Sequence, residues 1–186
     1  MPPKVKVTKE DIISCAVEIV RKDGADAVNA RNVAAAMNCS TQPVFSNFSS
    51  MDELKLAVAK RADELCNKYI EAECEKGEYP SYKASGIAYI RFAKEEKELF
   101  KLLYMRDRSK EGYSLDSPLN DSMISQVQKN TGLEKDTAAL FHLEMWAVVH
   151  GIATMLATGF LDLDPELISR ITSDTYQGLR KQYGME

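Results

Sequence analysis

The sequence lacks the short motifs that usually mark an enzyme. It contains no GxSxG, Walker loop, HExxH, GxGxxG or CxxC pair, so no nucleophile elbow, phosphate loop or two-histidine zinc site can be recognised. One His-x-Glu combination, His142 with Glu144, lies alone in an apolar segment and matches no catalytic spacing. An enzyme is therefore the least supported functional class, and we predict no catalytic residue.

Cysteine and histidine are scarce, which argues against a metal site or a disulfide framework. The two histidines, His142 and His150, are eight residues apart, which is roughly 12 Å along a helix axis and too far for one ion to bind both. Cys66 and Cys74 have the same separation, which is too long for an intrachain bridge within one helix. We predict free thiols in a reducing compartment and no metal or other cofactor.

The sequence also lacks a strong positive charge and a long apolar run. Its net charge is −4, and the acidic and basic residues of positions 1–55 cancel, which disfavours an unstructured, non-specific nucleic-acid binder but allows a local reading surface. The first residues contain no apolar core typical of a signal peptide. The longest apolar stretch, 146–161, contains a histidine and is shorter than the ~20 residues that span a bilayer. We expect a soluble cytoplasmic protein that does not enter a membrane.

Apolar residues recur with the period of a helix along most of the chain, and no segment alternates like a strand. Capping residues, glycines and prolines divide this pattern into about nine helices. We predict an all-α protein with helices near residues 8–23, 30–37, 41–48, 50–76, 119–130, 134–159 and 165–184, and two more between 82 and 107. A polar loop is predicted at residues 106–118.

The stretch 29–48 predicts two short helices joined by a tight corner. Asn29 can cap the first helix, and Asn38 tolerates the left-handed conformation that ends it. Ser40 is the predicted cap of the second helix, which places Pro43 in its first turn, where the missing amide has no partner to lose. From this spacing alone, a DNA-reading helix-turn-helix and an ordinary helical corner stay equally open.

Residues 8–60 resemble the DNA-binding domain of the TetR/AcrR family of bacterial transcriptional regulators. The similarity lies in the segments RKDGADAVNAR, VAAAMNCS and PVFSNFSSMDEL, which include the end of the recognition helix and the start of a long fourth helix. The segment 146–151 also resembles a Trp-x-x-x-His-Gly motif found in the ligand-binding half of one subgroup. The resemblance implies a helix-turn-helix DNA-binding domain at residues 1–49 and a helical ligand-binding and dimerisation domain at 50–186.

The resemblance also assigns DNA contacts, and three positions depart from the family pattern. The implied DNA-binding residues are Lys6, Asn29, Arg31, Ser40, Thr41, Gln42, Pro43, Phe45, Ser46, Asn47 and Lys55. An adenine edge paired with Gln42 or Asn47 would contribute ~1–3 kcal/mol of discrimination, although a solvated helix face would have the same composition. Asn38 replaces the usual corner glycine, and Phe45 and Met51 replace a tyrosine and a basic residue that hold phosphates in the family.

The carboxy-terminal half has two readings. A ligand pocket would use His150 to orient a largely apolar small molecule, but a packed core with a satisfied histidine would look the same in sequence. The residues predicted to line the pocket are Tyr89, Phe92, Met105, Met123, Phe141, Trp146 and His150. The resemblance implies a ligand-responsive repressor that binds a palindromic double-stranded DNA operator as a homodimer formed through its last two helices. The alternative is a helical adaptor without sequence-specific DNA binding.

Overall fold

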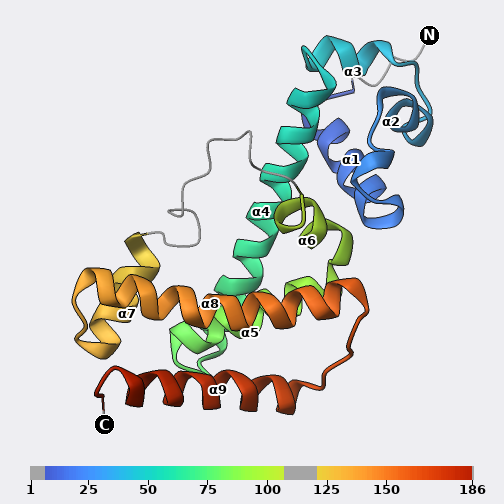
Figure 1. Ribbon diagram of the computed structural model, residues 1–186. Coiled ribbons are helices and arrows are strands. Elements are labelled where there is room, and N and C mark those ends of the chain that lie inside the picture. Colours follow the sequence, from blue (N-terminus) through green and yellow to red (C-terminus); the bar gives the residue numbers. More distant parts are fainter. Residues whose placement is uncertain (1–6, 107–120, 186) are drawn as a thin grey trace. The chain divides into compact units, whose positions relative to one another are not determined.

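Every regular element of the described chain is a helix. The computed structural model describes residues 7–106 and 121–185, and within them the predicted all-α class with about nine helices is confirmed (Figure 1). The helices are α1 (Lys9–Asp23), α2 (Ala30–Ala36), α3 (Gln42–Asn47), α4 (Met51–Lys76), α5 (Ser81–Glu95), α6 (Lys97–Tyr104), α7 (Asp121–Thr131), α8 (Lys135–Thr158) and α9 (Pro165–Gln182), with the 3₁₀ turn η1 (Ala25–Ala27) before α2. The predicted loop at 106–118 lies, after its first residue, outside the described residues.

The chain divides into two compact units. The amino-terminal unit comprises the residues up to Asn67 together with Glu96–Arg106, and the carboxy-terminal unit comprises Lys68–Glu95 and the described residues after 120. Helix α4 contributes its first part to one unit and its last nine residues to the other. The expected domain boundary between residues 49 and 50 stays a prediction.

The amino-terminal unit is built on one stripe of α1. Ile12, Ala16 and Val20 are fully buried at intervals of four residues, so one helical face supplies the core. Helix α1 packs against α2, α3 and α6, which brings the later helix α6 into the core of the helix-turn-helix. Arg21 holds this contact with two charge-assisted hydrogen bonds to Glu96, at 2.7 and 2.8 Å.

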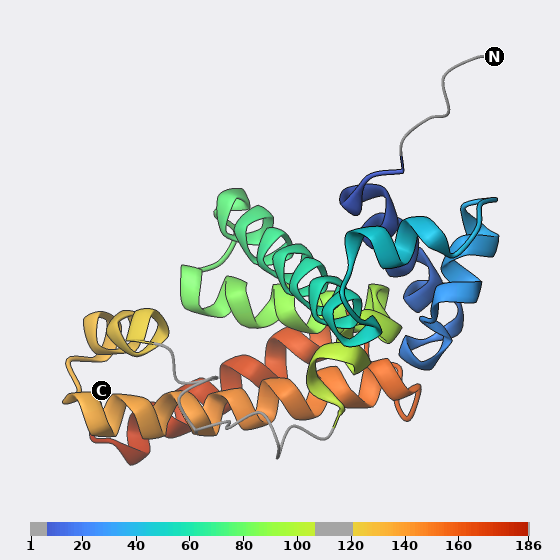
Figure 2. The ribbon, with the colours of Figure 1, turned by 90° about the horizontal axis from the view of Figure 1, so that it is seen from above.

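The carboxy-terminal unit is organised around α8. This helix packs against α5, α7 and α9, and Figure 2 shows α8 and α9 running alongside each other. Among the described helices, α8 alone is long and apolar enough to cross a membrane. That test is weak evidence, because a core helix of a soluble protein also passes it. We treat α8 as the core helix of this bundle because three other helices pack against it.

Most of the predicted helix starts are confirmed, and one is wrong. Thr8 and Asp11 form the expected capping box, and Asp164 caps α9 just before Pro165. Ser40 does not cap α3. The residue before α3 is Thr41, which already has helical backbone angles and makes no side-chain capping bond. A cap acts from an extended backbone, so the tight corner removes the geometry that a side-chain cap would need.

Candidate nucleic-acid interface

The first helix of the corner begins as the sequence predicts. The side-chain oxygen of Asn29 accepts hydrogen bonds from the amides of Arg31 and Asn32, at 3.1 and 3.0 Å, and its amide nitrogen donates to the carbonyl of Ala27. These bonds satisfy amides that the first turn of a helix leaves unpaired. Asn29 therefore fixes the direction of α2.

The turn between α2 and α3 depends on a left-handed residue. Asn38 has φ 51°, as predicted. The amide of the next residue, Cys39, donates to the carbonyl of Ala34 at 2.9 Å, which is the long closing bond of a Schellman turn. This bond reverses the chain within a few residues and sets the direction in which α3 leaves the corner.

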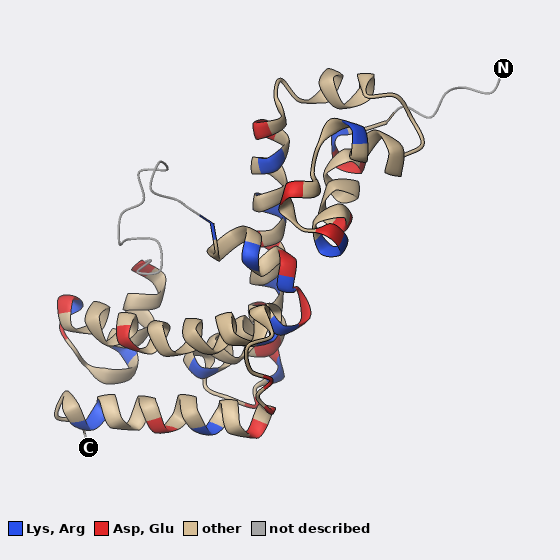
Figure 3. Cartoon of the chain, turned by 45° about the vertical axis from the view of Figure 1, so that its right-hand side comes forward, with Lys and Arg blue, Asp and Glu red and all other residues tan. Residues whose placement is uncertain are grey.

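Helix α3 has a buried face and an exposed face. Val44 and Phe48, four positions apart, are almost fully buried and fix the helix to the unit. Gln42, Phe45 and Ser46 are exposed and lie on one face, because residues three and four positions apart are neighbours on a helix. No charged residue occurs in α3 (Figure 3).

Two predicted contact residues form hydrogen bonds within α3. The hydroxyl of Ser46 donates to the carbonyl of Gln42 at 2.9 Å, and the amide of Asn47 donates to the carbonyl of Pro43 at 2.8 Å. The hydroxyl proton of Ser46 and one amide proton of Asn47 are therefore engaged. The side-chain amide of Gln42 has no hydrogen-bond partner among residues 7–106 and 121–185, so its nitrogen can donate and its oxygen can accept.

The cations near the corner differ in their pairing. Arg31 and Lys55 are exposed and form no ion pair within the described part of the chain. Lys9 instead binds Glu53 at 2.7 Å and lies over the ring of Phe48 at 4.6 Å. Of the remaining predicted contacts, Ser40 is exposed, Thr41 and Pro43 are half-buried, and Lys6 lies outside the described residues.

Glu53 joins the start of α4 to α1. The ammonium of Lys9, followed by the amide and hydroxyl of Ser49, lowers the pKa of Glu53 to about 2. Hydrogen bonds from Ser49 reach the same carboxylate at 2.7 and 2.8 Å. Glu53 therefore stays ionised at neutral pH and holds α1 and the start of α4 together.

Three of the predicted pocket residues meet between α5 and α8. The hydroxyl of Tyr89 lies 2.9 Å from Nδ1 of His150, and the His150 ring stacks on Trp146 with 4.5 Å between centroids. Burial lowers the pKa of His150, so its neutral form is favoured. The group offers a flat aromatic surface beside a polar pair.

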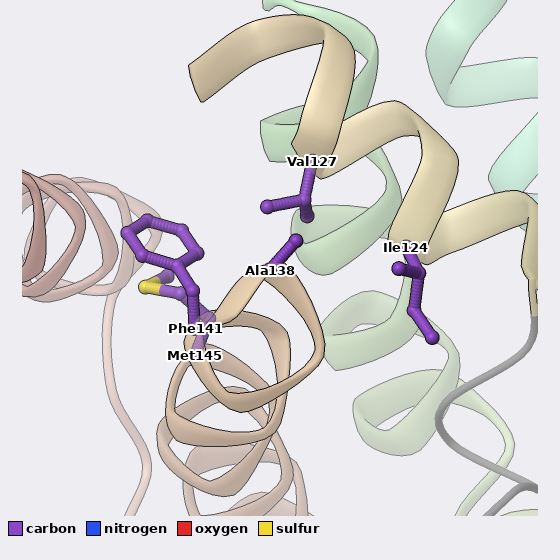
Figure 4. Packing of buried hydrophobic residues seen from close by; sticks show 5 residues of the cluster. All are labelled: Ile124, Val127, Ala138, Phe141 and Met145. Carbon is purple, nitrogen blue, oxygen red and sulfur yellow. The ribbon is translucent and has the colours of Figure 1, made fainter. Parts of the chain in front are cut away.

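The other predicted pocket residues lie elsewhere. Phe141 is fully buried in a cluster between α7 and α8 (Figure 4), where it also contacts Tyr176 of α9. Phe92 is fully buried against Tyr69. Met123 is half-buried on α7, and Met105 belongs to the amino-terminal unit. The lining of the pocket as a whole stays a prediction.

A second tyrosine–histidine pair was missed in the sequence. The hydroxyl of Tyr82 lies 2.9 Å from Nδ1 of His142, and burial followed by the neighbouring Tyr176 raises the pKa of Tyr82. The available signal was spacing, since the tyrosines are seven residues apart on α5 and the histidines eight apart on α8, about two turns in each case. Within the described residues, no three His, Cys, Asp or Glu side chains gather as a metal site.

Comparison with known proteins adds evidence from a different part of the chain. A family model described as tetracyclin repressor-like, C-terminal domain, matches residues 82–174, which is half of the 186 residues. This range does not overlap residues 8–60, which carry the helix-turn-helix resemblance, so the two findings depend on different residues. No curated protein matches the chain.

Proposed function

Since the chain belongs to the tetracycline repressor-like (TetR) family of regulators, we propose that it is a ligand-responsive repressor that binds a palindromic operator as a homodimer. The observation that carries this proposal is the exposed face of α3, where Gln42, Phe45 and Ser46 lie opposite the buried Val44 and Phe48. A helix presented in this way can enter the major groove. The family points to a regulator, and we propose that it acts in the cytoplasm, without catalysis or membrane insertion.

Several features support a set of DNA contacts with two kinds of role. Arg31 and Lys55 are exposed and form no ion pair with any described residue. Both side chains therefore suit phosphate binding. Lys6, Ser40, Thr41, Pro43 and Asn47 remain proposed neighbours of the backbone or bases. Asn29 acts indirectly, because its side chain caps α2. This arrangement assigns base reading to α3 and phosphate binding to the residues around it.

The dimer is proposed to form through α8 and α9. Leu140, Ala147 and Gly151 lie along one stripe of α8, and Leu140 is 49 % exposed. On α9, Leu167 and Gly178 are also exposed and add an apolar and a small residue to the proposed interface. A side-chain carbon added at Gly151 or Gly178 would meet nothing within 4 Å, so both positions leave room for a second copy.

The effector site is proposed at Tyr89, Trp146 and His150. An aromatic surface beside a hydrogen-bonding pair suits a largely apolar molecule that carries one polar group. A ligand that favours one spacing of the two recognition helices would shift the population away from the DNA-binding state. Helix α4 is the element proposed to transmit the change, since it contributes residues to both units. Membership of the Trp-x-x-x-His-Gly subgroup is part of this proposal.

A mobility-shift assay with the DNA upstream of the protein's own gene tests the proposal. The wild-type chain should retain this DNA specifically, and Gln42→Ala combined with Asn47→Ala should abolish retention. The matched control is Gln182→Ala combined with Asn130→Ala, which removes the same two amides from exposed positions of the carboxy-terminal unit. Failure to retain DNA, or equal loss in both double variants, would reject operator binding. A monomer in light scattering at micromolar concentration would favour the adaptor alternative.

A further inference from the structure

The exposed face of α3 carries the amide of Gln42, the ring of Phe45 and the hydroxyl of Ser46, and no charged residue occurs in the helix (Figure 3). We propose that Phe45 reads the methyl group of a thymine in the major groove, close to an adenine read by Gln42. The inference rests on the proposed DNA binding and deepens it, because it assigns base identity to individual side chains.

Phe45 is a large apolar side chain that the core does not use. It is 57 % exposed, whereas Val44 of α3 and Phe48, the residue that follows α3, are 1 % and 2 % exposed and supply the packing. An exposed ring of this size gains most when another apolar surface covers it. The thymine C5-methyl is the apolar group that base edges present in the major groove. The ring also carries no hydroxyl that would direct it to a phosphate.

The neighbouring polar groups limit what else the helix can read. Ser46 and Asn47 donate to backbone carbonyls of their own helix, at 2.9 and 2.8 Å. The side-chain amide of Gln42 has no hydrogen-bond partner among the described residues, and its N–H and oxygen match the donor and acceptor pattern of adenine. Gln42 and Phe45 are thus the two exposed side chains of α3 that donate no hydrogen bond to their own helix, and an adenine edge and a thymine methyl both select A·T base pairs.

The spacing of the two readers fits neighbouring base pairs. Gln42 and Phe45 are three residues apart, so their backbones are separated by about 4.5 Å along the helix axis. Successive base pairs are about 3.4 Å apart. The two side chains can thus reach the same base-pair step or the next one. In a two-fold symmetric complex the pair occurs once in each half-site.

The charges around α3 suit a nucleic acid as the occupant of this surface. Arg31, in the first turn of α2, and Lys55, in the first part of α4, are exposed and have no ion pair within the described ranges. The helices before and after α3 therefore each carry an exposed cation, while α3 itself is neutral. An apolar and amide surface with an exposed cation in the segment before it and another in the segment after it suits a groove lined by phosphates.

Thymine-to-deoxyuridine replacement isolates the methyl contact. The full-length protein first selects its preferred duplex from a random pool, and each thymine of that duplex is then replaced singly by deoxyuridine, which removes only the methyl group. One thymine in each half-site should prove sensitive, with binding weakened about fourfold, the factor for losing the burial of one methyl group. The sensitive thymine should lie within two base pairs of the adenine whose replacement affects wild-type but not Gln42→Ala binding.

Two variants separate the proposed contact from a general loss of affinity. Phe45→Ala should bind the selected duplex more weakly and should lose its sensitivity to deoxyuridine at that thymine. Leu56→Ala is the matched control, because Leu56 is 70 % exposed in the same unit but lies on α4, and it should keep the full sensitivity. Circular dichroism of both variants checks that they fold.

The possible failures can be told apart. If the protein binds a selected duplex specifically and no thymine responds to deoxyuridine, the assignment of Phe45 is wrong and DNA binding stands. Equal sensitivity of Phe45→Ala and wild type would overturn the assignment in the same way. If no duplex is enriched by selection, both the assignment and the proposed function fail.

Discussion

The hydroxyl of Tyr89 and Nδ1 of His150 are 2.9 Å apart, so a hydrogen bond joins α5 to α8 inside an otherwise largely apolar contact. Tyr82 and His142 form the same bond, at 2.9 Å, two turns earlier on both helices. Two tyrosine–histidine pairs in the same order show that α5 and α8 run in parallel. A buried polar pair has to be satisfied by its partner, so these pairs also help to fix the register of the two helices.

His150, in the pair with Tyr89, should make the free energy of unfolding depend on pH. Burial lowers the pKa of His150 below its ordinary value of 6.5, so the unfolded chain takes up the proton first as the pH falls. The free energy of unfolding should therefore decrease below a pH of about 6.5, until the pH passes the lowered pKa of the folded protein. Thermal unfolding of wild type and of His150→Gln, measured at a series of pH values from about 8 to about 5.5, tests this.

The variant retains a hydrogen-bonding side chain but cannot take up a proton in this range. Its unfolding midpoint should therefore vary less with pH than that of wild type. The chain contains only two histidines, and His142 is present in both proteins, so the difference reports on His150. Parallel curves would show that the folded protein does not disfavour protonated His150.

The sequence predicted the helices well because their signals are local. Thr8, Asn38 and Asp164 act on backbone groups within a few residues, and the apolar stripe of α1 repeats every four residues. The partners of these helices depend on distant residues. Nothing near Arg21 indicates that it binds Glu96, 75 positions away, and so the packing of α6 with the helix-turn-helix could not be predicted.

The sequence also predicted only part of the candidate site. Its residues could be named from the resemblance, but the sequence could not tell which polar groups are free. Ser46 and Asn47 look like open hydrogen-bonding groups, and each donates to the carbonyl four residues earlier. In the predicted pocket, Tyr89 and His150 are 61 positions apart, and only the pairing of α5 with α8 brings them together.

Glu53 should make the stability of the amino-terminal unit sensitive to acid. Its pKa is lowered to about 2 from an ordinary value of 4.5, chiefly by Lys9, so the unfolded chain binds the proton at a higher pH than the folded one. The stability that the ionised group contributes above a pH of about 4.5 is lost as the pH falls towards 2. Glu53→Gln should flatten the decline of stability within this window, measured by chemical unfolding. Glu71→Gln, an exposed position on the same helix, should leave the decline as it is in wild type.

Replacing Asn38 by glycine should preserve the stability of the protein, whereas replacing it by alanine should lower it. Its φ of 51° lies in the left-handed region, which costs residues with a side chain roughly 1–2 kcal/mol and costs glycine little. Asn38→Gly should therefore keep or slightly raise the free energy of unfolding, while Asn38→Ala should lower it by about 1 kcal/mol. Urea unfolding followed by circular dichroism gives both values. Asn130→Ala, at an exposed position inside α7, should change stability by less than about 0.5 kcal/mol; a comparable loss there would attribute the effect to the missing amide.

Met51→Lys should strengthen operator binding and make it more sensitive to salt. Met51 is the first residue of α4, at the position where the family carries a phosphate-binding cation. A new lysine–phosphate contact releases about 0.9 counterion, so the slope of log affinity against log salt should steepen by about two for a dimer. A cation at a helix start also opposes the helix dipole, at a cost of about 0.3–1 kcal/mol, so the variant should be slightly less stable although it binds DNA better.

Gln182→Lys adds the same charge at the exposed end of α9 and should leave the slope unchanged. Equal steepening in both variants would mean that overall charge, and not a contact at the start of α4, governs the salt dependence.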